Sequence, residues 1–230
     1  MIGRTLMELS FYISILIQFI TGIVTFGGMF YKLPKQDNVL KDILRLETVV
    51  QLVEGIFYIY IISSLRYMGS NVITKRRYLD WLITTPMMLL STILYMEYEN
   101  NKTTNKIMNV KEFVSNNKKN ITNMFLFNTL MLVSGFLGEI GLMLKSITIP
   151  VGFVFLFLSF NIMYKNYVGK ADINKRIFLL MTIVWSLYGV AAMFPTIIKN
   201  LSYNILDVIS KNFYGLYLFS KVRDIAKQTI

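Results

Sequence analysis

The fold is decided by Asn204-Ile-Leu-Asp207-Val-Ile-Ser-Lys211-Asn-Phe-Tyr-Gly-Leu-Tyr-Leu218, an apolar segment with a lysine near its centre. Asp207 precedes this lysine by about one helical turn. A lysine at mid-membrane depth costs several kcal/mol unless it has a partner or a chemical use. We therefore expect Lys211 to belong to a functional site inside a membrane.

The composition of the whole chain is typical of a membrane protein, since 54% of its 230 residues are hydrophobic. A helix needs about 20 apolar residues to cross a bilayer core of roughly 30 Å. Stretches of suitable length lie at 5–30, 42–68, 77–96, 122–144, 147–167, 176–198 and 202–221. The sequence predicts an all-α, seven-transmembrane helix bundle that forms one domain over residues 1–230.

The distribution of positive charge predicts the orientation of the bundle. The formal net charge is +11, and cytoplasmic loops of membrane proteins carry the excess of Lys and Arg. Most of the 24 Lys and Arg residues follow the first, third, fifth and seventh predicted spans. We expect an extracellular N-terminus, a cytoplasmic C-terminus and a mobile cytoplasmic loop at 97–120, with a short surface helix at 105–114. The charge then serves topology and contact with anionic lipid, so we expect no nucleic-acid partner.

The chain has no cysteine and no histidine. It therefore lacks disulfides, thiolate nucleophiles, the commonest metal ligand and the usual general base. Any proton chemistry must use carboxylates, lysine, tyrosine and water. We expect neither an enzyme nor a metal site.

The third predicted span carries a row of polar residues in the run Arg77-Tyr-Leu-Asp80-Trp-Leu-Ile-Thr84-Thr85-Pro86-Met-Met88-Leu-Leu-Ser91. Spacings of three, four and seven residues return to one face of a helix, which groups Arg77, Asp80, Thr84 and Ser91. Each residue alone is compatible with simple packing. Asp80 and Asp207 near Arg77 and Lys211 would, however, balance two negative with two positive charges, as a buried site in lipid requires.

Three motifs together resemble the microbial (type 1) rhodopsins. They are Arg77-Tyr-x-Asp80-Trp-x-x-Thr84-Thr85-Pro86 in the third span, Trp185-x-x-Tyr188 in the sixth and Asp207-x-x-x-Lys211 in the seventh. The resemblance covers essentially the whole chain. It implies all-trans retinal on Lys211 as a protonated Schiff base, with Asp80 and Asp207 as counter-charges and Arg77 ordering them. A lysine amine condenses with an aldehyde, and nearby carboxylates keep the product charged.

The resemblance also implies a narrow slot for the chromophore. The residues that it places there, besides the charged ones, are Tyr78, Trp81, Thr84, Thr85, Met88, Met131, Gly135, Phe155, Trp185, Tyr188 and Ser210. Ordinary core packing is the competing interpretation for the aromatic and methionine side chains. Gly189 replaces a proline of the family and Ala192 replaces a large aromatic of many members, so we expect a looser sixth helix.

The third span also bears on transport. An outward proton pump needs a proton acceptor, which Asp80 can be. It usually has a donor carboxylate eleven residues later, roughly 16 Å towards the cytoplasm. That position is Ser91, so the triad Asp80, Thr84 and Ser91 disfavours an efficient pump. The presence of Asp80 disfavours an anion pump.

The second span indicates a channel. Glu47, Gln51 and Glu54 lie at i, i+4 and i+7 on an otherwise apolar helix. Intramembrane carboxylates face the bundle interior or water, and a row of them favours cations in a pore. The alternative is that Glu47 lies near the surface and pairs with Arg45 or Lys41.

Ser14 on the first span and Asn204 on the seventh are expected to form the facing wall. With the glutamates and the third-span triad, they resemble the first group of viral rhodopsins, from giant viruses of algae and other protists, which are regarded as light-gated cation channels. The resemblance implies passage of monovalent cations, with Ca²⁺ as a candidate modulator.

The expected setting is a multi-pass protein in a membrane of a virus-infected host cell, with a homo-oligomer left open. A light-driven outward proton pump, a photosensor without transport and a non-photoactive receptor or transporter remain alternatives.

Overall fold

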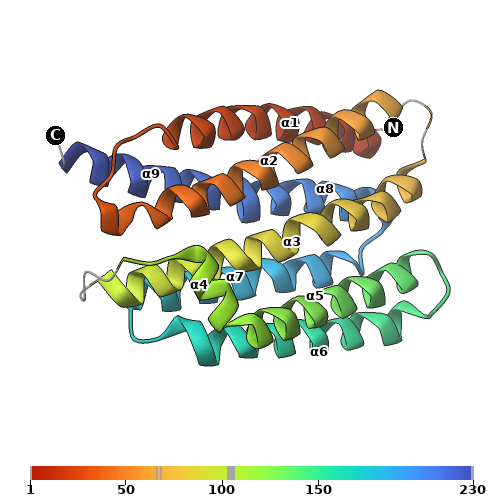
Figure 1. Cartoon of the computed structure of the whole chain (residues 1–230). Helices are drawn as coiled ribbons and strands as arrows, with labels where there is room; N and C mark the ends of the chain where they lie inside the picture. The colour runs from red at the N-terminus through yellow and green to blue at the C-terminus, as the bar shows by residue number, and fades with distance from the viewer. Residues whose placement is uncertain (1, 66, 68, 103–106, 229–230) are drawn as a thin grey trace.

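The computed structural model describes residues 2–65, 67, 69–102 and 107–228, and within these ranges the regular structure is helical throughout (Figure 1). The long helices are α1 (Ile2–Gly28), α2 (Val39–Ser64), α3 (Ser70–Asn101), α5 (Lys118–Glu139), α6 (Lys145–Met163) and α7 (Asp172–Ala191). Each of these six lies in a helical stretch long and apolar enough to cross a membrane. The prediction of an all-helical bundle is confirmed.

The seventh helix is assembled from three consecutive pieces. α8 (Thr196–Asp207) leads directly into a π-helical turn (Val208–Asn212), and α9 (Phe213–Gln228) continues from it. Lys211 lies in the π turn. A π turn inside a helix commonly marks a functional site, and this one contains the lysine that the sequence analysis singled out.

The bundle exposes apolar side chains on its outside and buries many polar ones beside its apolar core. On α1, Leu16 and Ile23 are 60% and 72% exposed, whereas Ser14 and Gln18 are buried. This is the arrangement expected when lipid rather than water surrounds the helices, because polar groups then gain by facing one another. The apolar surface therefore lies against the bilayer, and the interior is available for a polar site.

The helices run roughly along one common direction, and the N- and C-termini lie at opposite ends of the bundle (Figure 1). α1 and α2 lie on one side with α8 and α9 beside them, and α5 and α6 lie on the other. The short helix α4 (Val110–Asn116) lies in the half of the bundle that carries the C-terminus. The orientation across the membrane stays a prediction from the charge distribution.

Much of the predicted loop at 97–120 is helical. α4 overlaps the predicted surface helix at 105–114, whereas 97–101 belong to α3 and 118–120 belong to α5. Residues 97–101 continue α3, where Asn101 donates its side-chain amide to the Glu97 carbonyl over 2.9 Å. The Asn109 side chain caps α4 by accepting from two backbone amides, and Phe113 packs on Tyr167 with ring centroids 5.9 Å apart. The high asparagine content of this segment suggested a loop, but Asn101 and Asn109 instead form hydrogen bonds at helix ends. Residues 103–106, which include part of the predicted surface helix, lie outside the described residues.

Candidate functional site

Three carboxylates surround the amine of Lys211. Its Nζ lies 2.9 Å from Asp80 Oδ2, 3.2 Å from Glu54 Oε1 and 3.5 Å from Asp207 Oδ1. All four side chains are at most 2% exposed. The sequence analysis predicted Asp80 and Asp207 as partners of the lysine. It assigned Glu54 of α2 to the ion path, so the contact between Glu54 and the lysine was not predicted.

Arg77 forms the second cation of the cluster. Its Nη1 lies 2.8 Å from Asp207 Oδ2, its Nη2 donates to Asn204 Oδ1, and its Nε donates to Asn200 Oδ1 over 3.3 Å. The guanidinium also lies 5.2 Å from the centroid of the Phe11 ring. With Lys211, the cluster holds two cations against three carboxyl groups. The cluster thus has one carboxyl group more than the two that the sequence analysis balanced against two cations.

The two aspartates differ in their surroundings. Asp207 also accepts from Tyr188 Oη over 2.8 Å and from Tyr58 Oη over 3.1 Å. Asp80 is bonded through Oδ2 to Lys211, and its Oδ1 has no hydrogen-bond partner among the described residues. Asp207 is therefore held by several hydrogen bonds, whereas one oxygen of Asp80 has none among the described residues.

An apolar cavity opens between α3, α5, α6 and α7, with Lys211 in its wall. Predicted residues that line it are Tyr78, Trp81, Thr85, Met88, Met131, Gly135, Trp185, Tyr188 and Ser210. Residues that the sequence did not single out as lining residues are Leu132, Thr148, Ile149, Gly152, Phe153, Leu156, Gly189, Ala192 and Tyr203. Thr84, also predicted for this slot, is buried but does not line the cavity, and its hydroxyl donates to the Asp80 carbonyl over 3.0 Å.

The predicted contact of Phe155 is wrong. Phe155 stacks on Phe127 with ring centroids 6.3 Å apart, while Phe153 and Leu156 line the cavity. The apolar residues of α6 show almost no helical periodicity, so they do not indicate which side of the helix faces the cavity. At Gly189 of α7, a Cβ would lie 2.6 Å from Phe153 Cζ, so the Phe153 ring packs closely against this glycine. The expectation of a looser sixth helix stays a prediction.

A polar row runs along α2 from the cluster. Glu54, Gln51 and Glu47 are 0%, 2% and 0% exposed. Gln18 of α1 donates to Glu54 Oε2 and exchanges two hydrogen bonds of 3.0 Å with Asn212. Asn212 in turn donates to Gln51 Oε1 over 2.8 Å. The sequence analysis missed Gln18 and Asn212, although each lies one helical turn or less from a residue that it chose, Ser14 and Lys211.

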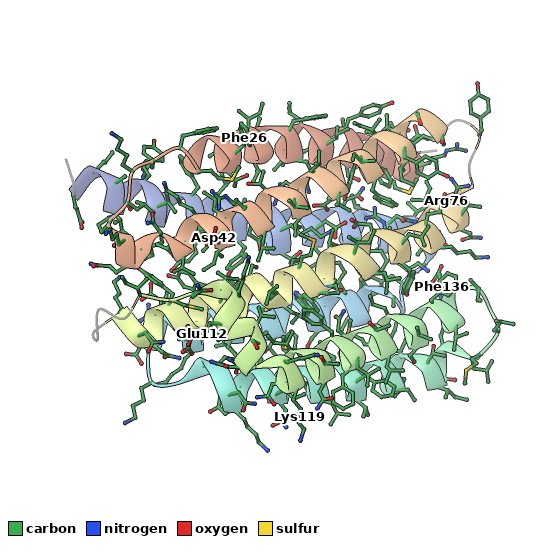
Figure 2. All side chains as sticks on the ribbon, viewed as in Figure 1. Phe26, Asp42, Arg76, Glu112, Lys119 and Phe136 are labelled. Carbon is green, nitrogen blue, oxygen red and sulfur yellow. The ribbon has the colours of Figure 1, made fainter. Side chains whose placement is uncertain are left out.

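Glu47 lies inside the bundle. Its Oε1 accepts a hydrogen bond from the Ser91 hydroxyl of α3. Arg45 pairs instead with Asp42 over 2.5 Å, at the surface. Figure 2 shows Asp42 near the end of the bundle where α2 begins. The alternative in which Glu47 pairs with a surface cation is therefore wrong.

The two residues predicted to form the facing wall are both buried, and Asn204 lies beside Arg77. Asn204 donates to Ser10 Oγ over 2.6 Å and accepts from Tyr58 Oη over 3.1 Å. Ser14 is buried on α1, one turn after Ser10. Asn204 thus belongs to the Arg77 end of the polar row, and Glu47 to the opposite end.

Comparisons with known proteins agree with this geometry. The family model described as "Bacteriorhodopsin-like protein" matches residues 5–225. The crystal structure of viral rhodopsin OLPVRII is similar with 30% identity and a TM-score of 0.84, over 96% of this chain and 99% of that chain. Blue light-absorbing proteorhodopsin from Med12 is similar in fold, with 19% identity, a TM-score of 0.73 and coverage of 95% and 97%.

Halorhodopsin from Halobacterium salinarum, in its bromide-bound form, has 15% identity and a TM-score of 0.70, over 98% of this chain and 95% of that chain. No curated protein sequence matches the chain. The family model covers nearly the whole chain, so the protein belongs to the bacteriorhodopsin-like family, the microbial rhodopsins, which implies a retinal chromophore and a multi-pass membrane location.

Proposed function

We propose that the protein is a light-gated cation channel that binds all-trans retinal on Lys211. The observation that carries the proposal is the row of buried polar side chains from Asn204, past Lys211 and Glu54, to Gln51 and Glu47. Polar groups in lipid are costly unless they serve a site or a path. A row rich in carboxylates favours cations.

The residues around Lys211 fit retinal. The amine opens into an apolar cavity flanked by Trp81 and Trp185, which suits a polyene, and three carboxylates lie beside it. Bound to this amine as a Schiff base, retinal would supply light absorption and a double-bond isomerisation. The protein's part is to hold the nitrogen between its carboxylates and to keep the cavity dry.

Gating follows from the charge balance of the cluster. Asp80 has a free oxygen and lies nearest to Lys211 Nζ, so it is the acceptor of the proton that leaves this nitrogen. Once Lys211 is neutral, Glu54 loses its cation partner at 3.2 Å. The hydrogen bond from Gln18 to Glu54 can then break, and the Glu54 carboxylate can bind a hydrated cation. Opening of the hydrogen bonds among Glu54, Gln18 and Asn212 would join the two ends of the row.

The same row suggests the permeant ions and the setting. Single carboxylates spaced along a helix suit monovalent cations, and Ca²⁺ would act on them as a modulator. We place the α4 end of the bundle at the cytoplasm, following the positive-inside bias. The chain would work as one domain over residues 1–230, in a membrane of a virus-infected host cell, as a monomer or a homo-oligomer.

An outward proton pump is the second candidate, favoured by the free oxygen of Asp80 beside Lys211. Voltage-clamp recording of retinal-supplied cells distinguishes the pump, the channel and the photosensor. With equal ion concentrations on both sides and no applied voltage, a pump passes steady current and a channel passes none. A channel passes current once a voltage is applied, and a photosensor passes none at any voltage. Lys211→Ala must abolish every photocurrent.

A further inference from the structure

We propose that a membrane-facing cavity between α7 and α9 binds one acyl chain of an anionic phospholipid, whose headgroup pairs with Arg176. This α7–α9 cavity is lined by residues of α3, α7, the π turn and α9, and it is separate from the cavity that opens at Lys211. The proposal concerns lipid binding alone. It rests neither on ion conduction nor on retinal.

The α7–α9 cavity has the size and lining of a site for hydrocarbon. Its volume is about 360 Å³, within the range of about 300–1,000 Å³ that is usual for ligand sites. Its wall is largely apolar and includes Ile177, Leu180, Met181 and Phe213. Leu180 and Phe213 are 59% and 58% exposed, so they lie at its mouth on the surface that faces lipid. An acyl chain can therefore enter from the bilayer without crossing a polar barrier.

The depth of the cavity matches one leaflet of a bilayer. Arg176 lies in the second turn of α7, and Trp185 follows nine residues later on the same helix. Both side chains line the cavity. This separation corresponds to about 14 Å along a helix. The acyl chains of one leaflet fill half of a core of roughly 30 Å, so a chain whose headgroup lies at Arg176 reaches Trp185.

The outer part of the cavity carries positive charge. Arg176 is exposed and forms no ion pair among the described residues, whereas its neighbour Lys175 pairs with Asp172 over 3.2 Å. Lys221 of α9 lies 5.6 Å from the ring centroid of Tyr217, which also lines the cavity. A guanidinium group offers two parallel N–H donors to a phosphate, so an anionic headgroup is the partner that Arg176 lacks.

The charge of the headgroup follows from the position of this mouth. Arg176 lies at the α4 end of the bundle, which the positive-inside bias assigns to the cytoplasm. The cytoplasmic leaflet is the one that carries anionic phospholipids. A net-neutral lipid could fill the apolar part, but its phosphate is already balanced by its own cation. The pairing with Arg176 therefore selects an anionic lipid.

The inner end of the α7–α9 cavity adjoins the cavity at Lys211. Met88, Trp185 and Ser210 line both cavities. Met88 and Trp185 are 3% and 8% exposed, so they form a buried wall between the two spaces. A bound acyl chain packs against one side of this wall. The indole of Trp185 can therefore report whether the α7–α9 cavity is occupied.

The test uses the fluorescence of Trp185 in the full-length protein without retinal. The chain has two tryptophans, and Trp81 does not line the α7–α9 cavity, so Trp81→Phe leaves Trp185 as the only emitter. The protein is placed in phosphatidylcholine vesicles that contain a rising fraction of phosphatidylglycerol with bromine in the middle of its chains. Bromine quenches an indole that it touches, so quenching measures occupancy by the anionic lipid.

A parallel series replaces the brominated phosphatidylglycerol by brominated phosphatidylcholine. One basic residue near the membrane surface favours anionic lipid by about fivefold. We therefore expect half-maximal quenching by phosphatidylglycerol at a lipid fraction lower by about fivefold or more. Quenching should also saturate, as binding to a single site requires.

Three variants assign the preference to the cavity. Arg176→Gln should lower the preference for phosphatidylglycerol by about fivefold. Arg45→Gln is the matched control, because it removes an exposed cation of α2 that does not line the cavity, and it should keep the preference. Ile177→Phe places a larger side chain in the cavity and should weaken quenching by both lipids.

Several results would overturn the proposal. Equal quenching by the two lipids would show that the cavity takes any chain, and an unchanged preference in Arg176→Gln would show that Arg176 holds no headgroup. An unquenched Trp185 would mean that a second copy of the chain or a closed wall excludes lipid. If Trp81→Phe does not fold, the protein with both tryptophans is compared with Trp185→Phe instead. Since retinal is absent throughout, a failure of the channel proposal leaves these outcomes unchanged.

Discussion

Glu54 Oε1 lies 3.2 Å from Lys211 Nζ, so a helix-two glutamate is a direct partner of the lysine as well as a member of the polar row. This contact links events at Lys211 to the row without any intermediate element. Glu54→Gln keeps the shape and the ability to accept from Gln18 while removing the charge. We expect it to reduce the photocurrent strongly while the coloured pigment still forms, because Asp80 and Asp207 remain beside the lysine.

Recording whole-cell photocurrent and absorbance on the same Glu54→Gln preparation tests this link. An unchanged current per pigment molecule would remove Glu54 from the conduction path.

The two aspartates should respond differently to amidation. Asp207→Asn leaves the fully buried Arg77 without its carboxylate at 2.8 Å, and breaking a buried ion pair costs about 3–5 kcal/mol. Asp80→Asn leaves Arg77 paired with Asp207, so it should lower the free energy of unfolding by clearly less. Thermal unfolding of the two variants without retinal measures the difference. Equal losses of Tm would show that Asp207 has no special structural role.

Asp80→Asn should instead affect proton movement. Because Asp80 is the proposed acceptor, its amide should slow the light-driven loss of the Lys211 proton by about 100-fold or more. Flash absorbance spectroscopy follows this step. A wild-type rate in Asp80→Asn would point to Glu54 or Asp207 as the acceptor.

Gly215→Ala should narrow the polar row without disturbing the fold. The added methyl meets Thr25, Thr21 and Gln51 at 3.4–3.6 Å, which is ordinary van der Waals contact. Alanine also suits a helix better than glycine by about 1 kcal/mol. We expect unchanged or higher thermal stability with a smaller photocurrent. Gly55→Ala on α2 is the matched control, since nothing lies within 4 Å of its Cβ, and a full photocurrent in both variants would contradict the proposed path.

Gly135→Ala should disturb the retinal cavity. Its Cβ would lie 2.8 Å from Tyr78 Oη, too close for a hydroxyl held between α3 and α5. Overpacking of this kind typically costs about 1–3 kcal/mol. We expect slower pigment formation and a shifted absorption maximum, read by titrating the protein with retinal. Normal kinetics and colour would mean that Tyr78 moves freely.

An ion cluster outside the retinal site offers a test of folding. Glu139 joins α5 to Lys199 of α8 over 2.7 Å and to Lys145 of α6 over 2.9 Å. The Lys199 side chain is 2% exposed, so Glu139→Gln should destabilise the bundle by about 3–5 kcal/mol. The more exposed Lys145 should contribute only about 0–1 kcal/mol. Thermal unfolding of Glu139→Gln and Lys145→Ala compares them, and similar losses would show that burial of the pair is unimportant.

Helix number and the principal charges could be predicted because lipid imposes simple rules. Apolar length gave the spans, and the cost of charge in lipid singled out Lys211, Asp80 and Asp207. The contact between Glu54 and Lys211 could not be predicted, because it depends on how α2 rotates against the seventh helix. Gln18 and Asn212 were missed for the same reason.

The errors have physical causes of the same kind. The apolar residues of α6 show almost no helical periodicity, so they do not distinguish the cavity-facing Phe153 from Phe155. The segment after the third span looked like a loop because asparagine and lysine dominate it, although Asn109 and Asn101 stabilise helix ends there. Composition shows which residue types dominate a segment, but it does not show which of them will cap a helix.

The central claim is that light opens a path for cations, and the reversal potential of the photocurrent tests it most directly. Under voltage clamp, a tenfold change in the external concentration of the main permeant cation should shift the reversal potential by about 59 mV, the value for one charge. The account predicts such a shift for sodium or potassium. An outward photocurrent that does not reverse over the accessible voltages and follows only the proton gradient would contradict it.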